Sequence, residues 1–145
     1  MAMHSVIEID RPAHEVYGFF LDLERNIVAT DPTVESVVKT TDGPLGAGST
    51  FLIRQPVMGT VREQTMRITR ADPDKEIDID AAFGPIRPRL TLTFNPTPTG
   101  TRVTMRGDSR PVGVLKLVTL LMDRIGERNW DRRLRLIKST LEGPG

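Results

Sequence analysis

The stretch PVGVLKLVTLLMDRIGERNWDRRLRLIKSTL, residues 111–141, decides the fold of this chain. It runs almost without a helix breaker, whereas everything before it is short, strand-like and interrupted by Gly and Pro. At 100° per residue, its second half places four apolar residues within about 60° of one another. These are Trp130, Leu134, Ile137 and Leu141. A long final helix with such a stripe must cover a sheet, which predicts an α+β fold.

The first half of this helix carries a second apolar face, which points roughly 160° away from the first. It consists of Val114, Leu117, Val118, Leu121, Met122 and Ile125. Gly126 separates the two faces, so the helix either bends there or runs straight with both faces buried. A bend makes the first half a gate for a cavity. In a straight helix, this face forms a homodimer contact or lies under the loops between strands. The simplest interpretation is that the first half is apolar core packed on several sides.

Composition limits the classes of protein to consider. The 145 residues with 38% apolar content are enough for one domain, which we expect to span 1–145. Charges nearly cancel, with 20 basic against 19 acidic residues, so there is no overall field that favours DNA. There is no cysteine, no apolar run long enough to span a membrane and no leader-like start, and we therefore expect a cytoplasmic protein.

The rest of the chain reads as one strand, two short helices and six more strands. The strand 3–10 is followed by a helix starting near Pro12, with Asp10 as its expected N-cap, and by a helix or turn over 26–32. Strands are predicted at 33–41, 49–55, 60–71, 76–83, 86–95 and 101–109, and the last five form an antiparallel meander. The expected fold is a curved antiparallel sheet of six or seven strands that grips the last helix.

Alternation in the later strands assigns their two faces. The apolar set predicted for the concave face is Ile77, Ile79, Ala81, Leu90, Leu92, Phe94, Val103 and Met105. The polar set predicted for the convex face is Asp78, Asp80, Thr91, Thr93, Arg102 and Thr104.

This order and three local phrases resemble the START-like SRPBCC superfamily, and within it the polyketide cyclase/dehydrase and lipid-transport group with the Bet v 1-like helix-grip fold. The phrases are IEIDRPAHEVYGFFLDLERN, DGPLGAGSTF and the closing strand TRVTMRG before the long helix. The resemblance covers nearly the whole chain and implies a cavity for a hydrophobic small molecule. It implies no particular activity, because this fold serves carriers, cyclases, hydrolases and regulators.

The chain departs from the family pattern after Asn26, where Ile27 and Val28 stand in place of the usual aromatic residue. Aromatic residues make up only 5% of the chain, so an aliphatic or irregular ligand is favoured over a flat polyaromatic one. The residues expected to line the cavity are Phe20, Ile53, Gln64, Met66, Ile79, Leu92, Met105, Val118 and Met122. No cofactor or metal is expected, because His4 and His14 have no metal-ligand spacing.

Two other functions stay open. One is a cofactor-free cyclase or dehydratase that uses acid/base residues of the cavity, with Asp31, Arg62 and Asp123 as candidates. The other is a module that contacts a macromolecule through a basic stripe of the last helix. That stripe is Arg124, Arg128, Arg132 and Arg135, within about 80° of arc, and pairing with nearby acids makes a solvated surface the simpler interpretation.

Overall fold

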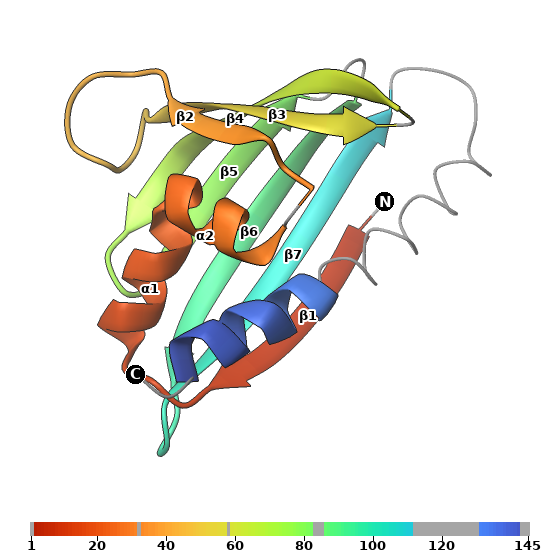
Figure 1. Ribbon diagram of the computed structural model, residues 1–145. Helices are drawn as coiled ribbons and strands as arrows, with labels where there is room; N and C mark the ends of the chain where they lie inside the picture. Colours follow the sequence, from red (N-terminus) through yellow and green to blue (C-terminus); the bar gives the residue numbers. More distant parts are fainter. Residues whose placement is uncertain (1, 32, 58, 83–85, 112–130, 143–145) are drawn as a thin grey trace.

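A computed structural model describes residues 2–31, 33–57, 59–82, 86–111 and 131–142. Its elements follow the order β1 (Ala2–Ile9), α1 (Ala13–Leu21), α2 (Leu23–Thr30), β2 (Ser36–Lys39), β3 (Thr50–Val57), β4 (Thr60–Asp72), β5 (Glu76–Ala82), β6 (Ile86–Pro96) and β7 (Thr101–Pro111). A helix over residues 131–142 ends the described chain and is called here the C-terminal helix. The predicted fold class, a curved antiparallel sheet with two short helices after the first strand and a final helix, is confirmed (Figure 1).

One seven-stranded antiparallel sheet contains all the strands, in the spatial order β1-β7-β6-β5-β4-β3-β2. The predicted meander is the run from β3 to β7, in which each strand pairs with the next. The last strand, β7, returns to pair with β1, which forms one edge of the sheet. β2 forms the other edge. A register shift between Ile68 and Arg70 interrupts the β4–β5 ladder. Such an irregularity adds local twist, which helps the sheet curve around the helices.

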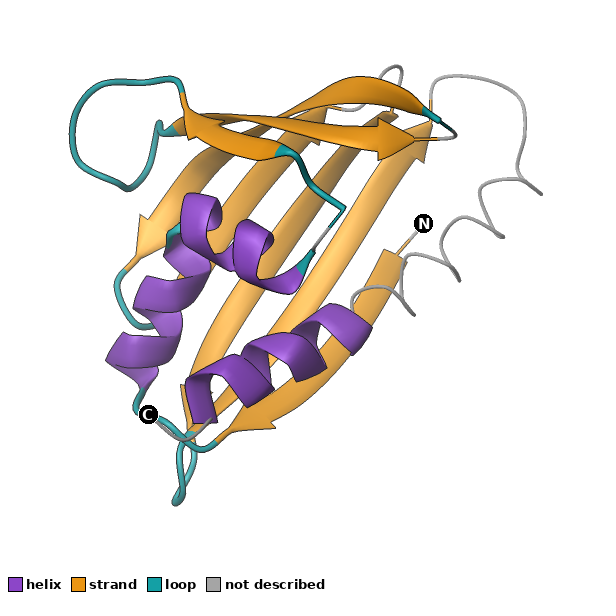
Figure 2. Cartoon of the chain, in the orientation of Figure 1, coloured by secondary structure: helices purple, strands orange, loops and turns teal. Residues whose placement is uncertain are grey.

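The two faces of the sheet have the polarity that alternation predicted. All eight residues predicted for the concave face are buried. On the other face, Glu8 and Arg102 oppose one another across β1 and β7 and form an ion pair of 2.8 Å. Asp80 and Arg89 do the same across β5 and β6 at 3.6 Å. Both helices after β1 and the C-terminal helix lie on the concave side (Figure 2).

The C-terminal helix buries the stripe that the sequence indicated, as far as the structure describes it. Leu134 and Ile137 are each 1% exposed, and Leu141 packs against the same core. Trp130 lies outside the described residues. A full side-chain burial of this kind contributes roughly 1.5–3 kcal/mol for each large aliphatic residue. The helix is therefore held on the sheet mainly by apolar contact.

Polar contacts fix the far end of that helix against the start of the chain. The Lys138 Nζ donates to the Glu8 carbonyl at 2.6 Å and pairs with Glu142 one turn further on at 2.8 Å. The Asp10 amide donates to a Glu142 carboxylate oxygen at 3.2 Å. The bonds to Glu8 and Asp10 join residues more than 100 positions apart in the sequence, and they orient the helix across β1.

Two local predictions about the helices were wrong. The first helix has Pro12 rather than Asp10 as its N-cap, with φ −61° and ψ 151° and no side-chain cap. The fixed φ of proline suits this helix entry, so the helix starts at Ala13, beyond the reach of Asp10. The second helix begins at Leu23 instead of residue 26, because the Asp22 carboxylate accepts from the Arg25 amide at 3.3 Å and caps it.

Among the described residues, no helix is long and apolar enough to cross a membrane.

Candidate functional site

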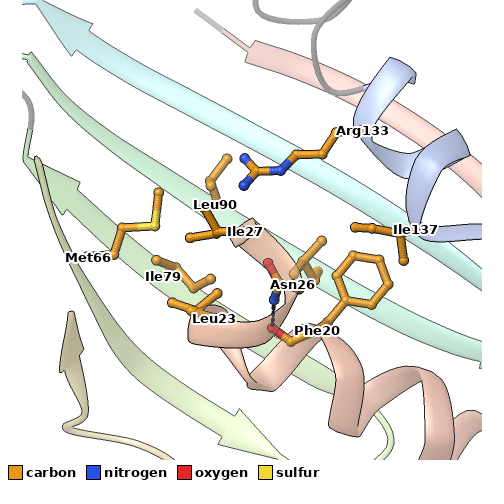
Figure 3. Close-up of a pocket in the computed structure, with 10 residues that line it drawn as sticks. Phe20, Leu23, Asn26, Ile27, Met66, Ile79, Leu90, Arg133 and Ile137 are labelled. Carbon is orange, nitrogen blue, oxygen red and sulfur yellow. Dashed lines mark hydrogen bonds between the residues drawn. The ribbon is translucent and has the colours of Figure 1, made fainter. Parts of the chain in front are cut away.

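A pocket opens between α2, the concave face of the sheet and the C-terminal helix (Figure 3). About 340 Å³ of space there is free of protein atoms, a figure that includes the part open to solvent. Among the residues that the structure describes, those that line it are Phe20, Leu23, Asn26, Ile27, Met66, Ile79, Leu90, Leu92, Arg133 and Ile137. Eight of these ten side chains are apolar, and the two polar ones are an amide and a guanidinium.

The second helix supplies one wall because its buried residues recur at helical spacing. Leu23, Asn26, Ile27 and Thr30 stand at positions i, i+3, i+4 and i+7, and all four are buried. The opposite side of the helix faces solvent, where Val28 is 57% exposed. Two polar residues therefore share the inward face of α2 with two apolar ones.

The sheet supplies the floor of the pocket from three neighbouring strands. Met66 lies on β4, Ile79 on β5, and Leu90 and Leu92 on β6. Ile79 stands directly opposite Leu90 in the β5–β6 ladder, which places both side chains on the concave face. The floor is thus a continuous aliphatic surface.

Asn26, which lies in the pocket wall, caps the C-terminal end of α1 with its side-chain amide. Its Nδ2 donates to the Phe20 carbonyl at 2.8 Å and to the Phe19 carbonyl at 3.2 Å. These carbonyls belong to the last turn of α1, where no intrahelical amide is available. Because both partners are acceptors, the amide nitrogen must face them and Oδ1 must face the other way. Figure 3 shows that oxygen turned toward the inside of the pocket.

Arg133 brings a cation to the upper wall. Its side chain reaches from the C-terminal helix over the apolar residues, with the guanidinium turned toward Leu90 and Ile27 (Figure 3). The Nε–H donates to the Thr30 hydroxyl at 3.2 Å. Burial lowers the pKa of the Arg133 guanidinium, and the charge of Asp31 counteracts that effect in part. An arginine guanidinium is not deprotonated in proteins, so the group stays cationic at neutral pH.

Asp31 lies at the end of α2, half-buried beside this cation. It is the C-cap residue of the helix. Its Oδ1 accepts from the Thr33 amide at 3.0 Å and from the Thr33 hydroxyl at 2.6 Å. The carboxylate is therefore held in a local turn, and it acts on Arg133 through its charge.

The residues expected to line a cavity fall into three groups. Phe20, Met66, Ile79 and Leu92 line this pocket. Ile53 and Met105 are buried in the core, at 1% and 0% exposure, but are not among the lining residues, and Gln64 is half-buried on β4. Val118 and Met122 lie outside the described residues. Of the acid/base candidates, Asp31 adjoins the pocket, Arg62 is exposed, and Asp123 lies outside the described residues.

Both polar lining residues escaped the sequence analysis, although a signal existed for each. Arg133 precedes Ile137 by four positions, about 40° around the helix, and so belongs to the inward side rather than to the basic stripe. Asn26 shares helical spacing with Leu23 and Thr30. A search for polar residues within an apolar stripe would have found both.

Predictions about the first half of the last helix are not tested. Gly126, Leu117, Leu121 and Ile125 all lie outside the described residues, as do Arg124 and Arg128 of the basic stripe. The other two members of that stripe, Arg132 and Arg135, are exposed. In the part of the chain that the structure describes, no three His, Asp or Glu side chains are grouped as a metal site would require.

The sequence resemblance implied a cavity, and the described residues form an apolar pocket between the sheet and the C-terminal helix. The sequence matches the family described as polyketide cyclase / dehydrase and lipid transport over residues 2–142. The chain belongs to this family. No curated protein matches the sequence.

Solved structures with low sequence identity to this family member share its fold. The crystal structure of Ara h 8.0201 has a TM-score of 0.81 at 11% identity, with 99% of each chain covered. A START superfamily protein from Mycobacterium smegmatis has a TM-score of 0.77 at 10% identity, with 97% of each chain covered. The di-domain ARO/CYC BexL from the BE-7585A biosynthetic pathway has a TM-score of 0.79 at 21% identity, covering 99% of this chain and 48% of that one.

The departure of this chain from the family pattern lies in the pocket itself. Ile27, where the sequence resemblance led us to expect an aromatic residue, is 3% exposed and lines the pocket. Of the ten lining residues that the structure describes, Phe20 alone is aromatic. The described walls are therefore mostly aliphatic.

Proposed function

We propose that the protein binds a hydrophobic small molecule, lipid-like or polyketide-like, in the pocket between α2, the sheet and the C-terminal helix. The observation that carries this proposal is the described part of the lining, in which eight of ten side chains are apolar and the other two can fix a ligand's orientation. Ligand sites in proteins commonly combine an apolar wall with a few placed polar groups.

The character of the pocket walls narrows the ligand class. The described walls are mostly aliphatic. Met66 offers an adaptable wall, because its unbranched side chain changes shape at little cost. An aliphatic or irregular molecule fits these walls better than a flat ring system.

A cyclase or dehydratase is the second candidate, because the family includes such enzymes and BexL is named as an ARO/CYC protein. Acid/base chemistry requires titratable groups held in the site with separated pKa values. The described lining residues supply one cation and one amide, and the carboxylate of Asp31 is engaged by Thr33. These residues favour binding over catalysis. A macromolecular contact through Arg132 and Arg135 stays a prediction, with salt-sensitive binding as its sign.

Two adjacent residues of α2 allow a matched test. Ile27 lines the pocket, whereas Val28 points to solvent. We expect Ile27→Trp to fill the pocket and abolish ligand binding, and Val28→Trp to leave binding unchanged. The measurement is thermal shift of the wild-type protein and both variants against a panel of fatty acids, sterols and polyketides, with circular dichroism to establish that each variant is folded.

The size of the expected effect follows from mass action. A ligand at a hundredfold excess over its Kd stabilises the native state by about 2.7 kcal/mol. For a chain of this length, that corresponds to a rise in Tm of roughly 5–10 °C. The proposal fails if no apolar compound shifts the Tm of the wild-type protein, or if Ile27→Trp responds to the same ligand as strongly as Val28→Trp.

A further inference from the structure

The side chain of Asn26 presents a hydrogen-bond acceptor to the apolar pocket. Asn26 is only 5% exposed, and its amide nitrogen is held by the Phe19 and Phe20 carbonyls, which leaves Oδ1 on the pocket side (Figure 3). Within the described part of the chain, no residue donates a hydrogen bond to Oδ1. A buried acceptor without a partner is costly, so a bound molecule that donates to it would gain from the contact.

The two hydrogen bonds also fix the direction in which this amide points. An exposed Asn side chain can rotate by about 180° and offer a ligand either its donor or its acceptor. At Asn26 that rotation would place Oδ1 against two carbonyl oxygens, where Nδ2 now lies 2.8 Å from the Phe20 carbonyl and 3.2 Å from the Phe19 carbonyl. The amide of Asn26 therefore offers the pocket an acceptor only, and it is oriented before a ligand binds.

The other polar residue on the inward face of α2 does not satisfy Oδ1. The Thr30 hydroxyl donates to the backbone carbonyl of Asn26 at 2.7 Å and accepts from the Arg133 Nε–H at 3.2 Å. A hydroxyl group has a single hydrogen to donate, and that hydrogen is engaged within the helix. Any water on Oδ1 is displaced when a ligand fills the pocket, and a ligand that cannot replace its hydrogen bond loses affinity.

The surroundings of Oδ1 select a neutral donor. A carboxylate brings acceptors alone and is repelled by Oδ1. An ammonium group can donate, but it is costly to move its charge from water to a wall of Ile27, Ile79 and Leu90. A hydroxyl group donates one hydrogen bond and carries no charge, so it meets both requirements.

We propose that the ligand is an aliphatic alcohol, whose hydroxyl group donates to Oδ1 of Asn26 and whose hydrocarbon body packs on Ile79, Leu90 and the other apolar lining residues. This inference rests on the proposed function and names the chemical class of its ligand. Since the acceptor is fixed, the site distinguishes an alcohol from the ketone of the same carbon skeleton, which brings a second acceptor to the same place.

The test measures the affinity of three probes of equal chain length by isothermal titration calorimetry near neutral pH: 2-octanol, 2-octanone and octanoate. We expect the wild-type protein to bind 2-octanol about tenfold or more tightly than 2-octanone, and also more tightly than octanoate. Asn26→Ala is expected to lose the preference for the alcohol over the ketone while it binds both. The control is Val28→Ala, on the solvent side of the same helix, which keeps the preference.

Each outcome has one meaning. Equal affinity of the wild-type protein for 2-octanol and 2-octanone overturns the alcohol inference and leaves the apolar pocket standing, as does tighter binding of octanoate. A preference that survives in Asn26→Ala also overturns it. If none of the three probes binds and the panel of larger compounds is equally silent, the proposed function itself fails.

A second measurement on the wild-type protein keeps the inference testable if Asn26→Ala does not fold. In ¹⁵N-resolved NMR spectra, the side-chain amide resonances of Asn26 report on the partner of Oδ1. We expect them to shift on addition of 2-octanol and to shift much less with 2-octanone. Equal shifts with the two probes would contradict a hydrogen bond from the hydroxyl group.

Discussion

Gly100 should be hard to replace, because the backbone that links β1 to α1 occupies the place where a Cβ would stand. It lies in the turn between β6 and β7, where its carbonyl accepts from the Thr97 amide at 2.8 Å. A Cβ added at this position would lie 2.1 Å from the Ile9 carbonyl oxygen and 2.9 Å from the Arg11 amide nitrogen. Ordinary van der Waals contact begins near 3.4 Å, so the two backbone segments would have to separate by about an ångström.

The cost of that separation is set by what these segments hold. The Thr101 hydroxyl, next to Gly100, donates to the Arg11 carbonyl at 2.8 Å, and Thr101 is fully buried. Overpacking costs typically about 1–3 kcal/mol, and a backbone neighbour has no rotamer with which to yield. The lower entropy of an unfolded chain with Ala in place of Gly returns only about 0.4–1 kcal/mol. We therefore expect Gly100→Ala to lower the free energy of unfolding by about 2 kcal/mol.

For a chain of this size, that loss lowers the Tm by roughly 4–8 °C. The assay is thermal and urea unfolding followed by circular dichroism, with Gly46→Ala as the matched control. A Cβ at Gly46 meets no atom within 4 Å, so this variant should unfold within about a degree or two of the wild-type protein. If Gly100→Ala is as stable as Gly46→Ala, the close approach of the two segments is wrong.

Three further predictions concern groups around the helices. Asn26→Ala leaves two carbonyls of α1 without their buried donor, so urea unfolding should show a loss of about 1–3 kcal/mol, and an unchanged midpoint would contradict the capping role. A hydrogen bond from Lys138 lowers the pKa of Glu142, so its contribution to stability is present above the ordinary carboxyl pKa and is lost as pH falls through the lowered one. Unfolding curves of wild type and Glu142→Gln should therefore converge in acid, and a constant difference at all pH values would refute the linkage. Burial is the main cause that raises the pKa of Tyr17, and the charge of Asp74 raises it further. The stability that Tyr17 contributes is therefore complete below the ordinary tyrosine pKa and declines as pH rises through the raised value. Tyr17 is the only tyrosine, so an absorbance titration reads it directly, and Asp74→Asn should lower its midpoint.

Local pattern was enough to predict the sheet and its faces. In β5, each buried residue alternates with a half-buried one, because successive side chains of a strand point to opposite faces regardless of what the strand packs against. The boundaries of α1 and α2 were predicted less well. These boundaries depend on which of several neighbouring residues caps the helix. Asp22 caps α2, and Pro12 sets the start of α1.

The sequence by itself determined the fold class, the concave and convex faces and the inward stripe of the C-terminal helix, because the helical and strand periodicities that encode them are properties of short segments. Only the tertiary structure decided which of the many inward residues meet at the pocket. Arg133 reaches Thr30 across 103 positions of the chain, and Ile53 and Met105 have the same burial pattern as Ile79 yet do not line the pocket. The physical reason is that strand order, the curvature of the sheet and the docking of helices bring distant segments together, and periodicity along one segment carries no record of its neighbours in space.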